Sequence, residues 1–117
     1  MKNQASISAL LHLIGERQSF VISSHIRPDG DAIGSALGLL HLLEAMGKTA
    51  TVVFIDPIPP SFQFLAGAER ISCTFPEADA AILLECDSLE RCSIERSEYD
   101  AAPPALTINI DHHRSGR

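Results

Sequence analysis

Apolar positions recur at helical spacing in two stretches of this chain. The first stretch predicts an amphipathic helix over residues 3–17, and the second predicts a helix over residues 32–46. The second helix is apolar on nearly every side, with Gly34 and Gly38 one turn apart on it. We therefore expect these two glycines to let the helix backbone approach a sheet closely, and Gly47 to form the carboxyl-terminal cap.

Between and after these helices, short runs of apolar and β-branched residues predict strands. The four predicted strands are Phe20–Ser24, Thr49–Ile55, Ala80–Cys86 and Leu106–Ile110. The first strand, second helix and second strand form a β-α-β unit, which requires a parallel sheet. Continuous apolar strands are expected where helices cover both faces of such a sheet. The predicted fold is therefore α/β, with a parallel sheet in a three-layer αβα arrangement.

Two segments near the carboxyl end complete this picture. Residues 89–99 are mostly polar and predict a loop with a short helix. No further helix or strand is expected after Ile110, so one sheet edge and part of a face are expected to stay uncovered. The sequence is therefore expected to be cut short.

Composition limits the classes of protein that fit. The 117 residues suit one domain, and 45% hydrophobic with 21% charged residues is ordinary for a globular protein. A net charge of −6 argues against a broad basic surface for gripping phosphates. Three cysteines without a C-x-x-C pair argue against a disulfide framework and favour a reducing cytoplasm. No membrane span or signal peptide is expected.

Histidine and aspartate gather where three predicted strands end. His25, Asp29 and Asp31 follow the first strand, Asp87 the third, and the triplet 111–113 the fourth. In an open parallel sheet, ligands bind beyond the carboxyl ends of the strands. Without metal ions, each pair of like charges about 4 Å apart would cost on the order of 4 kcal/mol at an effective dielectric near 20. The clusters therefore predict a centre for two divalent metal ions that acts on a phosphate ester.

Each candidate also has an ordinary structural explanation. Asp31 is placed to cap the helix that follows, and a lone strand-end aspartate such as Asp87 would be equally open to that interpretation. For Asp111, support of the cluster and simple capping look alike in sequence. His12 and His41 are expected to be ordinary surface or boundary histidines. The combination of residues at three strand ends favours the metal centre.

These residues form recognisable motifs. The stretch from His25 to Ser35, H-x-R-P-D-G-D-A-I-G-S, the strand-end Asp87 and the triplet D-H-H at 111–113 resemble the DHH phosphoesterase superfamily. The resemblance spans residues 5–113 and includes three of the four amino-terminal motifs of that family. Within it, the first motif and Glu-Cys-Asp-Ser are similar to the branch that degrades very short RNAs and dephosphorylates 3′-phosphoadenosine 5′-phosphate.

The resemblance implies a set of metal ligands for two divalent ions, expected to be Mn2+. His25 and Asp29 would hold one ion, Asp31 and His112 the other, and Asp87 would bridge both. Alanine at Asp29 or Asp31 is then expected to remove the activity of an intact parent with little loss of fold.

The resemblance also implies roles for residues near the substrate. His113 would act at the scissile phosphate as a substrate contact or proton donor, and Asp87 would share in catalysis through the ions. Arg27 and Ser35 would contact the phosphate, while Asp111 would orient the metal ligands. The expected function is a manganese-dependent hydrolase of short RNA or nucleotides.

Two departures from the family pattern leave alternatives open. The fourth acidic metal ligand and the carboxyl-terminal substrate-binding domain of the family are absent, so the chain is expected to be the amino-terminal part, residues 1–117, of a catalytic domain. The family function would then belong to a longer parent, for which a homodimer is open. The alternatives are a cyclic-dinucleotide phosphodiesterase, a single-strand exonuclease, an inorganic pyrophosphatase (usually N-P-D-T-D where this chain has Arg27–Asp31), or an inert metal-binding fragment.

Overall fold

A four-stranded parallel sheet lies at the centre of the molecule, with the strand order β2-β1-β3-β4. The computed structural model describes the backbone of residues 2–86 and 88–110, with side chains from residue 8 onward. Its helices and strands are α1 (Lys2–Gly15), β1 (Ser19–Ser24), α2 (Gly30–Ala45), β2 (Thr49–Val52), β3 (Ala80–Leu84), α3 (Arg96–Ala101) and β4 (Leu106–Ile110). Short 3-10 helices are η1 (Pro60–Phe62), η2 (Ala68–Arg70) and η3 (Leu89–Arg91). The predicted α/β class with a parallel sheet is confirmed.

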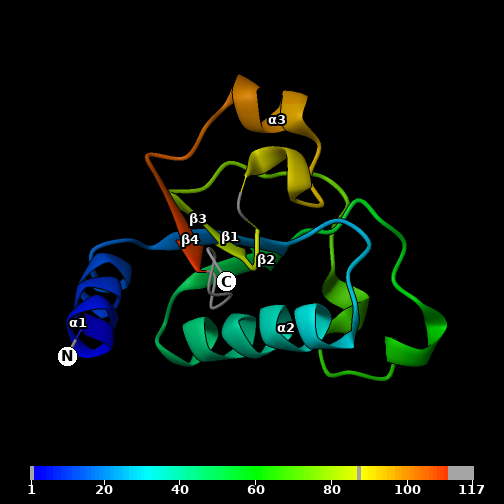
Figure 1. Ribbon diagram of the computed structural model, residues 1–117, viewed down its shortest axis with the longest axis horizontal. Coiled ribbons are helices and arrows are strands. Elements are labelled where there is room, and N and C mark those ends of the chain that lie inside the picture. The colour runs from blue at the N-terminus through cyan, green and yellow to red at the C-terminus, as the bar shows by residue number, and fades with distance from the viewer. Residues whose placement is uncertain (1, 87, 111–117) are drawn as a thin grey trace.

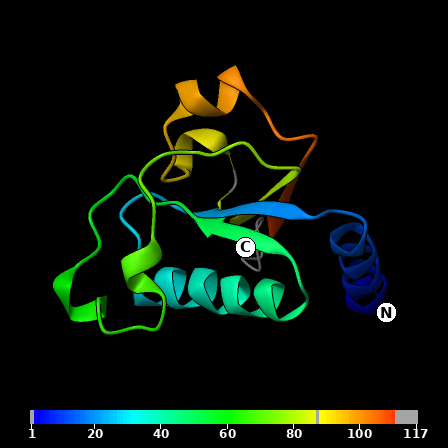
Figure 2. The ribbon, with the colours of Figure 1, turned by 180° about the vertical axis from the view of Figure 1, so that it is seen from behind.

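Figures 1 and 2 show three layers. Helix α2 lies along one face of the sheet, and η3 and α3 lie over the opposite face. Side chains of β1 alternate between these layers, because Phe20 and Ile22 belong to the core beside α2 while Val21 belongs to the other core. The second core also contains the buried Cys86, a small apolar residue that follows the end of β3.

Two strands end earlier than their apolar runs predict. The prediction extends the second strand to Ile55, but β2 ends at Val52, and Val53 makes an isolated parallel bridge to Ser72. The prediction extends the third strand to Cys86, but β3 ends at Leu84. Glu85 has φ of 59°, a left-handed conformation that takes the chain out of the extended geometry.

The face that α2 turns to the sheet differs from the one its glycines suggest. A Cβ atom built on Gly34 or Gly38 would meet nothing within 4 Å, so the predicted close approach at these glycines is wrong. The small residues on the buried side are Ala32 and Ala36. Helical periodicity puts residues 34 and 38 on the opposite side of the helix from these alanines. Gly47, with φ of 83° just after the helix, adopts the left-handed conformation expected of a cap residue.

The remaining elements follow the predicted pattern in outline. In α1, Ile14 is buried but Leu11 is exposed. The buried face of this helix is therefore narrower than the apolar face predicted from the sequence. In β4, Thr107 and Asn109 are exposed, so this strand is not covered on both faces. In the part of the chain that the structure describes, no helix is long and apolar enough to cross a membrane.

Asp79 connects the amino-terminal ends of β1 and β3 through hydrogen bonds. Its carboxylate accepts the backbone N–H groups of Gln18 at 3.1 Å and Ser19 at 3.2 Å. These hydrogen bonds stabilise the charged form and lower the pKa of the Asp79 carboxyl. The hydrogen bond from Gln18 has the largest effect. The resulting stabilisation is present above the unfolded pKa of about 4 and is lost as the pH falls through the lower folded value.

Asp79→Asn is therefore expected to lower the free energy of unfolding at neutral pH and to approach wild type in strong acid. The isosteric amide keeps an acceptor oxygen but loses the charge on which the pH dependence rests. Urea unfolding at several pH values measures this difference. Glu77→Gln, an exposed change two positions earlier, is the control for loss of one negative charge. If Asp79→Asn and wild type differed in free energy of unfolding by the same amount at neutral and acidic pH, the proposed stabilisation by the Asp79 charge would be contradicted.

Candidate metal centre

The carboxyl ends of three neighbouring strands are aligned. Ser24 of β1 pairs with Leu84 of β3, and Leu84 pairs with Ile110 of β4. The Ser24 hydroxyl also donates a 2.7 Å hydrogen bond to the Leu84 carbonyl. The chain leaves β1 for β2 on one side and later reaches β3 on the other, so the strand order reverses beside β1. Crevices at such reversals are the usual ligand sites of open α/β sheets.

Four predicted site residues fall outside the described residues. Asp87 comes three residues after the end of β3, and Asp111, His112 and His113 directly follow β4. Their predicted roles as bridging ligand, metal ligand and substrate contact therefore stay predictions. The aligned strand ends fix only where the chain enters these segments.

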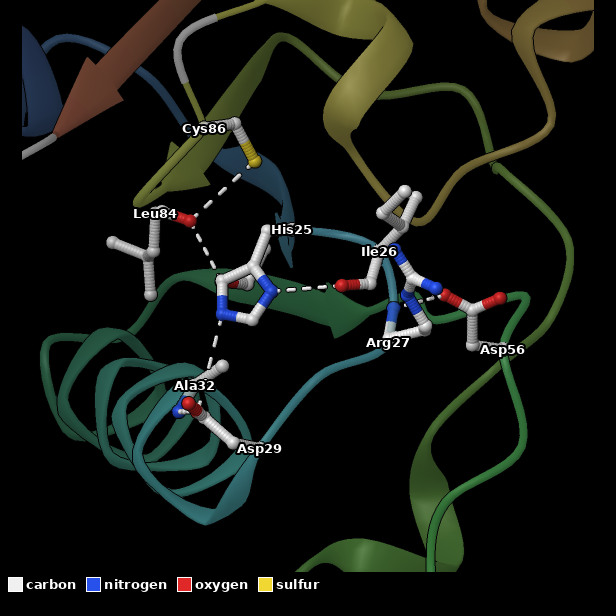
Figure 3. A network of polar contacts seen from close by, with 9 residues as sticks. His25, Ile26, Arg27, Asp29, Ala32, Asp56, Leu84 and Cys86 are labelled. Carbon is white, nitrogen blue, oxygen red and sulfur yellow. Dashed lines mark hydrogen bonds and ion pairs between the residues drawn. The ribbon is translucent and has the colours of Figure 1, made fainter.

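His25 follows β1 and is oriented by its own loop. Its Nδ1 lies 2.8 Å from the carbonyl oxygen of Ile26, and its Nε2 lies 3.9 Å from Oδ1 of Asp29 (Figure 3). A carbonyl oxygen can only accept, so the Nδ1 contact requires the proton on Nδ1. In the neutral imidazole Nε2 then carries the lone pair on the side of Asp29, and this is the form of histidine that binds metals.

Asp29, and not Asp31, is the N-cap of α2. The helix begins at Gly30, two residues earlier than predicted, and Oδ1 of Asp29 accepts the backbone N–H of Ala32 at 2.8 Å. The predicted cap at Asp31 is therefore wrong, because the torsion angles leave the helical region at Asp29. Asp31 instead lies exposed in the first turn of α2, where its charge is favourable to the helix dipole.

Gly30 packs closely against a neighbouring aromatic ring in this turn. A Cβ atom at this position would lie 2.8 Å from Cε1 of Phe62, whose ring is contributed by η1. Any larger residue at position 30 would have to displace that ring. The glycine of the PDGD motif thus joins the strand-end loop to the segment after β2.

The two predicted phosphate contacts are both exposed. Ser35 lies on α2 one turn after Asp31, and Arg27 lies in the loop between His25 and Asp29. Arg27 has φ of 51°, in the left-handed region that non-glycine residues seldom adopt. Its backbone N–H donates to Oδ2 of Asp56 at 2.6 Å (Figure 3).

The sequence analysis missed Asp56 and its partner Ser93. Asp56 follows the apolar run of the second strand, the same pattern that marks the other strand-end acids, and this signal could have found it. The Ser93 hydroxyl donates to Oδ2 of Asp56 at 3.1 Å and accepts the Asp56 backbone N–H at 3.0 Å. No sequence pattern marks Ser93, because it is one of several serines in a polar stretch.

The described residues fit a divalent ion as a pair of donors. Ligand atoms about 2.1 Å from one ion can lie up to about 4.2 Å apart, which accommodates the 3.9 Å between His25 Nε2 and Asp29 Oδ1. Imidazole nitrogen with carboxylate oxygen suits manganese, iron, cobalt or zinc. Among residues 2–86 and 88–110 no group of three or more His, Cys, Asp or Glu could hold a metal ion. Asp31 therefore does not join His25 and Asp29 in one such group.

The structure thus combines a parallel α/β sheet with a histidine–aspartate pair beyond β1, at the point where the strand order reverses. The chain is a member of the DHH family, whose N-terminal domain matches residues 19–117. The expected family resemblance is thereby confirmed.

Several relatives have names that describe their activity. The chain is 40% identical over 93 residues to the bifunctional oligoribonuclease and PAP phosphatase NrnA of Thermus thermophilus, covering 79% of this chain and 27% of the relative. It is 27% identical over 104 residues to NrnA of Bacillus subtilis, covering 89% of this chain and 32% of the relative. The chain thus spans about a third of the length of these relatives.

A relative with a different named activity and a solved structure complete the comparison. The cyclic-di-AMP phosphodiesterase GdpP of Bacillus subtilis is 29% identical over 121 residues, covering 92% of this chain and 18% of the relative. The crystal structure of an exopolyphosphatase-related protein from Bacteroides fragilis superposes with a TM-score of 0.81 at 31% identity. That match covers 97% of this chain and 36% of the other.

Proposed function

We propose that this chain is the amino-terminal part of the catalytic domain of a manganese-dependent DHH phosphoesterase. Its substrates would be short oligoribonucleotides and 3′-phosphoadenosine 5′-phosphate. The observation that best supports the proposal is the in-register alignment of Ser24, Leu84 and Ile110, because the three motifs follow these residues. The NrnA relatives support the substrate class.

The proposed ligands fall into two sets. His25 and Asp29 would hold one manganese ion, Asp31 and His112 the other, and Asp87 would be shared. Bound ions would supply the Lewis acidity that makes water a nucleophile at neutral pH and offsets the charge of the phosphate. In the metal-free chain, the acids alone would repel an anionic substrate.

The remaining residues would bind the substrate and move a proton. Water attacks phosphorus, the bond from phosphorus to the leaving oxygen breaks, and His113 would donate a proton to that oxygen. Arg27 and Ser35 would contact the phosphate oxygens, and Asp111 would orient the neighbouring histidines. The amino terminus of α2, which begins beside Asp29, adds a favourable field for an anion.

Gly30 favours this branch over a pyrophosphatase. The pyrophosphatase pattern has threonine where this chain has Gly30, and a Cβ there would lie 2.8 Å from the Phe62 ring. The second candidate is a cyclic-dinucleotide phosphodiesterase, which the similarity to GdpP favours. Tight manganese binding without hydrolysis would instead favour a metal-binding domain that needs a further part to act.

Manganese titration followed by an assay on the dinucleotide pApA tests the proposal. We expect Mn2+ binding, release of AMP from pApA, and loss of both on chelation. Asp87→Ala should abolish the hydrolysis, whereas Asp100→Ala, a carboxylate paired with Arg96 on α3, should not. Cleavage of cyclic di-AMP but not pApA would support the second candidate, and absence of Mn2+ binding would refute the metal centre.

A further inference from the structure

We infer that Asp56 is a positioning residue for His25 and acts through the peptide bond between Ile26 and Arg27. The inference rests on the proposed function, because it assigns to His25 the role of a metal ligand. Asp56 lies outside the three DHH motifs and reaches the site from the segment that follows β2.

The argument begins with one peptide group that makes two hydrogen bonds (Figure 3). Its carbonyl, from Ile26, lies 2.8 Å from Nδ1 of His25, and its N–H, from Arg27, lies 2.6 Å from Oδ2 of Asp56. A peptide group is planar, so fixing the direction of its N–H fixes the direction of its C=O. Asp56 therefore determines which way the oxygen that binds the imidazole points.

The same arrangement polarises the imidazole. A carboxylate that accepts the N–H makes the opposite carbonyl a better acceptor, because consecutive hydrogen bonds strengthen one another. The carbonyl in turn holds the proton of His25 on Nδ1 and leaves the Nε2 lone pair toward Asp29. Metal-binding histidines commonly have a carboxylate or carbonyl on the other nitrogen. In this chain the Ile26 carbonyl faces Nδ1 of His25, and the same peptide group is hydrogen-bonded to the Asp56 carboxylate.

Strain at Arg27 shows that this peptide needs to be held. Its φ of 51° is unfavourable for a residue with a side chain, so the loop would relax to another conformation without external contacts. Two such contacts are present, since the Ile26 N–H also donates to the Arg91 carbonyl at 2.7 Å. The contact to Asp56 fixes the strained residue itself.

Ser93 makes Asp56 a rigid support. This fully buried serine donates to Oδ2 of Asp56 at 3.1 Å, and its backbone N–H donates to the Ser24 carbonyl at 2.8 Å. The Ile55 N–H donates to the Ser93 carbonyl at 3.0 Å. Asp56 is thus tied to the end of β1, and its carboxylate cannot swing away without breaking these bonds.

The test compares Asp56→Ala with Asp56→Asn in the metal-free chain. Nitrogen-15 NMR at about pH 8, where imidazoles are mostly neutral, gives the tautomer of His25. We expect the Nδ1–H form in wild type, a shift toward the Nε2–H form in Asp56→Ala, and recovery in Asp56→Asn, whose amide oxygen can accept from Arg27. Amide exchange at Arg27 should accelerate only in the alanine variant.

Manganese affinity provides the functional readout. We expect Asp56→Ala to bind Mn2+ roughly 10- to 100-fold more weakly, and Asp56→Asn to stay close to wild type. Ser93→Ala keeps the Asp56 carboxylate but loses the hydrogen bond that supports it, so its Mn2+ affinity should lie between those of the two Asp56 variants. It replaces Asp56→Ala as the test variant if that protein folds poorly.

Two results would overturn the inference: an unchanged His25 tautomer with a protected Arg27 amide in folded Asp56→Ala, or an Mn2+ affinity equal to wild type. Wild-type chain that binds no Mn2+ would refute the proposed function instead. The tautomer and exchange measurements would still decide the role of Asp56.

Discussion

Asp29→Asn is expected to leave the chain as stable as wild type while lowering its affinity for Mn2+ by roughly 100-fold or more. The structure separates these two effects because Asp29 does two things. Its Oδ1 caps α2 by accepting from Ala32, and the same carboxylate lies 3.9 Å from His25 Nε2. Asparagine caps helices about as well as aspartate but is a poor metal ligand, since its amide carries no charge.

Asp29→Ala should lose both properties. Removal of the cap is expected to cost about 0.5–2 kcal/mol of stability in addition to the loss of metal affinity. Because Asp29 is the cap, we expect a larger loss of stability from alanine at Asp29 than from alanine at Asp31.

Asp100→Asn on α3, outside the proposed metal centre and away from the cap, is the matched control for a lost carboxylate. Isothermal titration with Mn2+ and urea unfolding of the metal-free chain measure the two effects separately. Equal Mn2+ affinity in wild type and Asp29→Asn would remove Asp29 from the metal centre. Equal stability of the alanine and asparagine variants would contradict its role as a cap.

Leu40→Ala is expected to cost about 2–5 kcal/mol of stability, a large part of the total for a domain of this size. Leu40 is 1% exposed and lies in the core between α2 and the sheet. Alanine there leaves a cavity, because surrounding side chains of β1, β2 and β3 are held by their strands and close it only in part.

Leu42→Ala is the control on the same helix. Leu42 is 55% exposed, so the same change of side chain should alter stability by no more than about 0.5 kcal/mol. Urea unfolding of both variants gives the comparison, and Mn2+ affinity of the folded Leu40→Ala protein should stay near the wild-type value. Similar losses at positions 40 and 42 would show that the assignment of the buried face of α2 is wrong.

Local periodicity predicted the elements well and their limits less well. The apolar run of β4 coincides with its strand, and the helical spacing before it located α1 and α2. The predicted strand Ala80–Cys86 is longer than β3, because the buried Cys86 follows the point at which the backbone turns at Glu85. Apolar side chains can be buried in a strand or just beyond it, and composition does not distinguish the two.

The faces of the elements were less predictable than their existence. Because α2 has apolar residues nearly all round, its sequence pattern does not say which side meets the sheet, and the glycines at 34 and 38 proved to be on the other side. For β4, Thr107 and Asn109 alternate with apolar residues, so the sequence already indicates the exposed face that the structure shows. Where a pattern has little contrast between faces, packing partners decide.

For the candidate site, the sequence by itself predicted the chemistry, since histidine and aspartate after strand-forming runs are residue types that bind metals whatever their exact placement. It also determined membership of the DHH family through its motifs. Only the tertiary structure decided that β1, β3 and β4 are neighbours with aligned ends, that Asp29 is the cap, and that Asp56 holds the loop. The physical reason is distance along the chain: Asp56 and Arg27 are 29 residues apart, so their hydrogen bond depends on how the strands assemble and leaves no periodic trace.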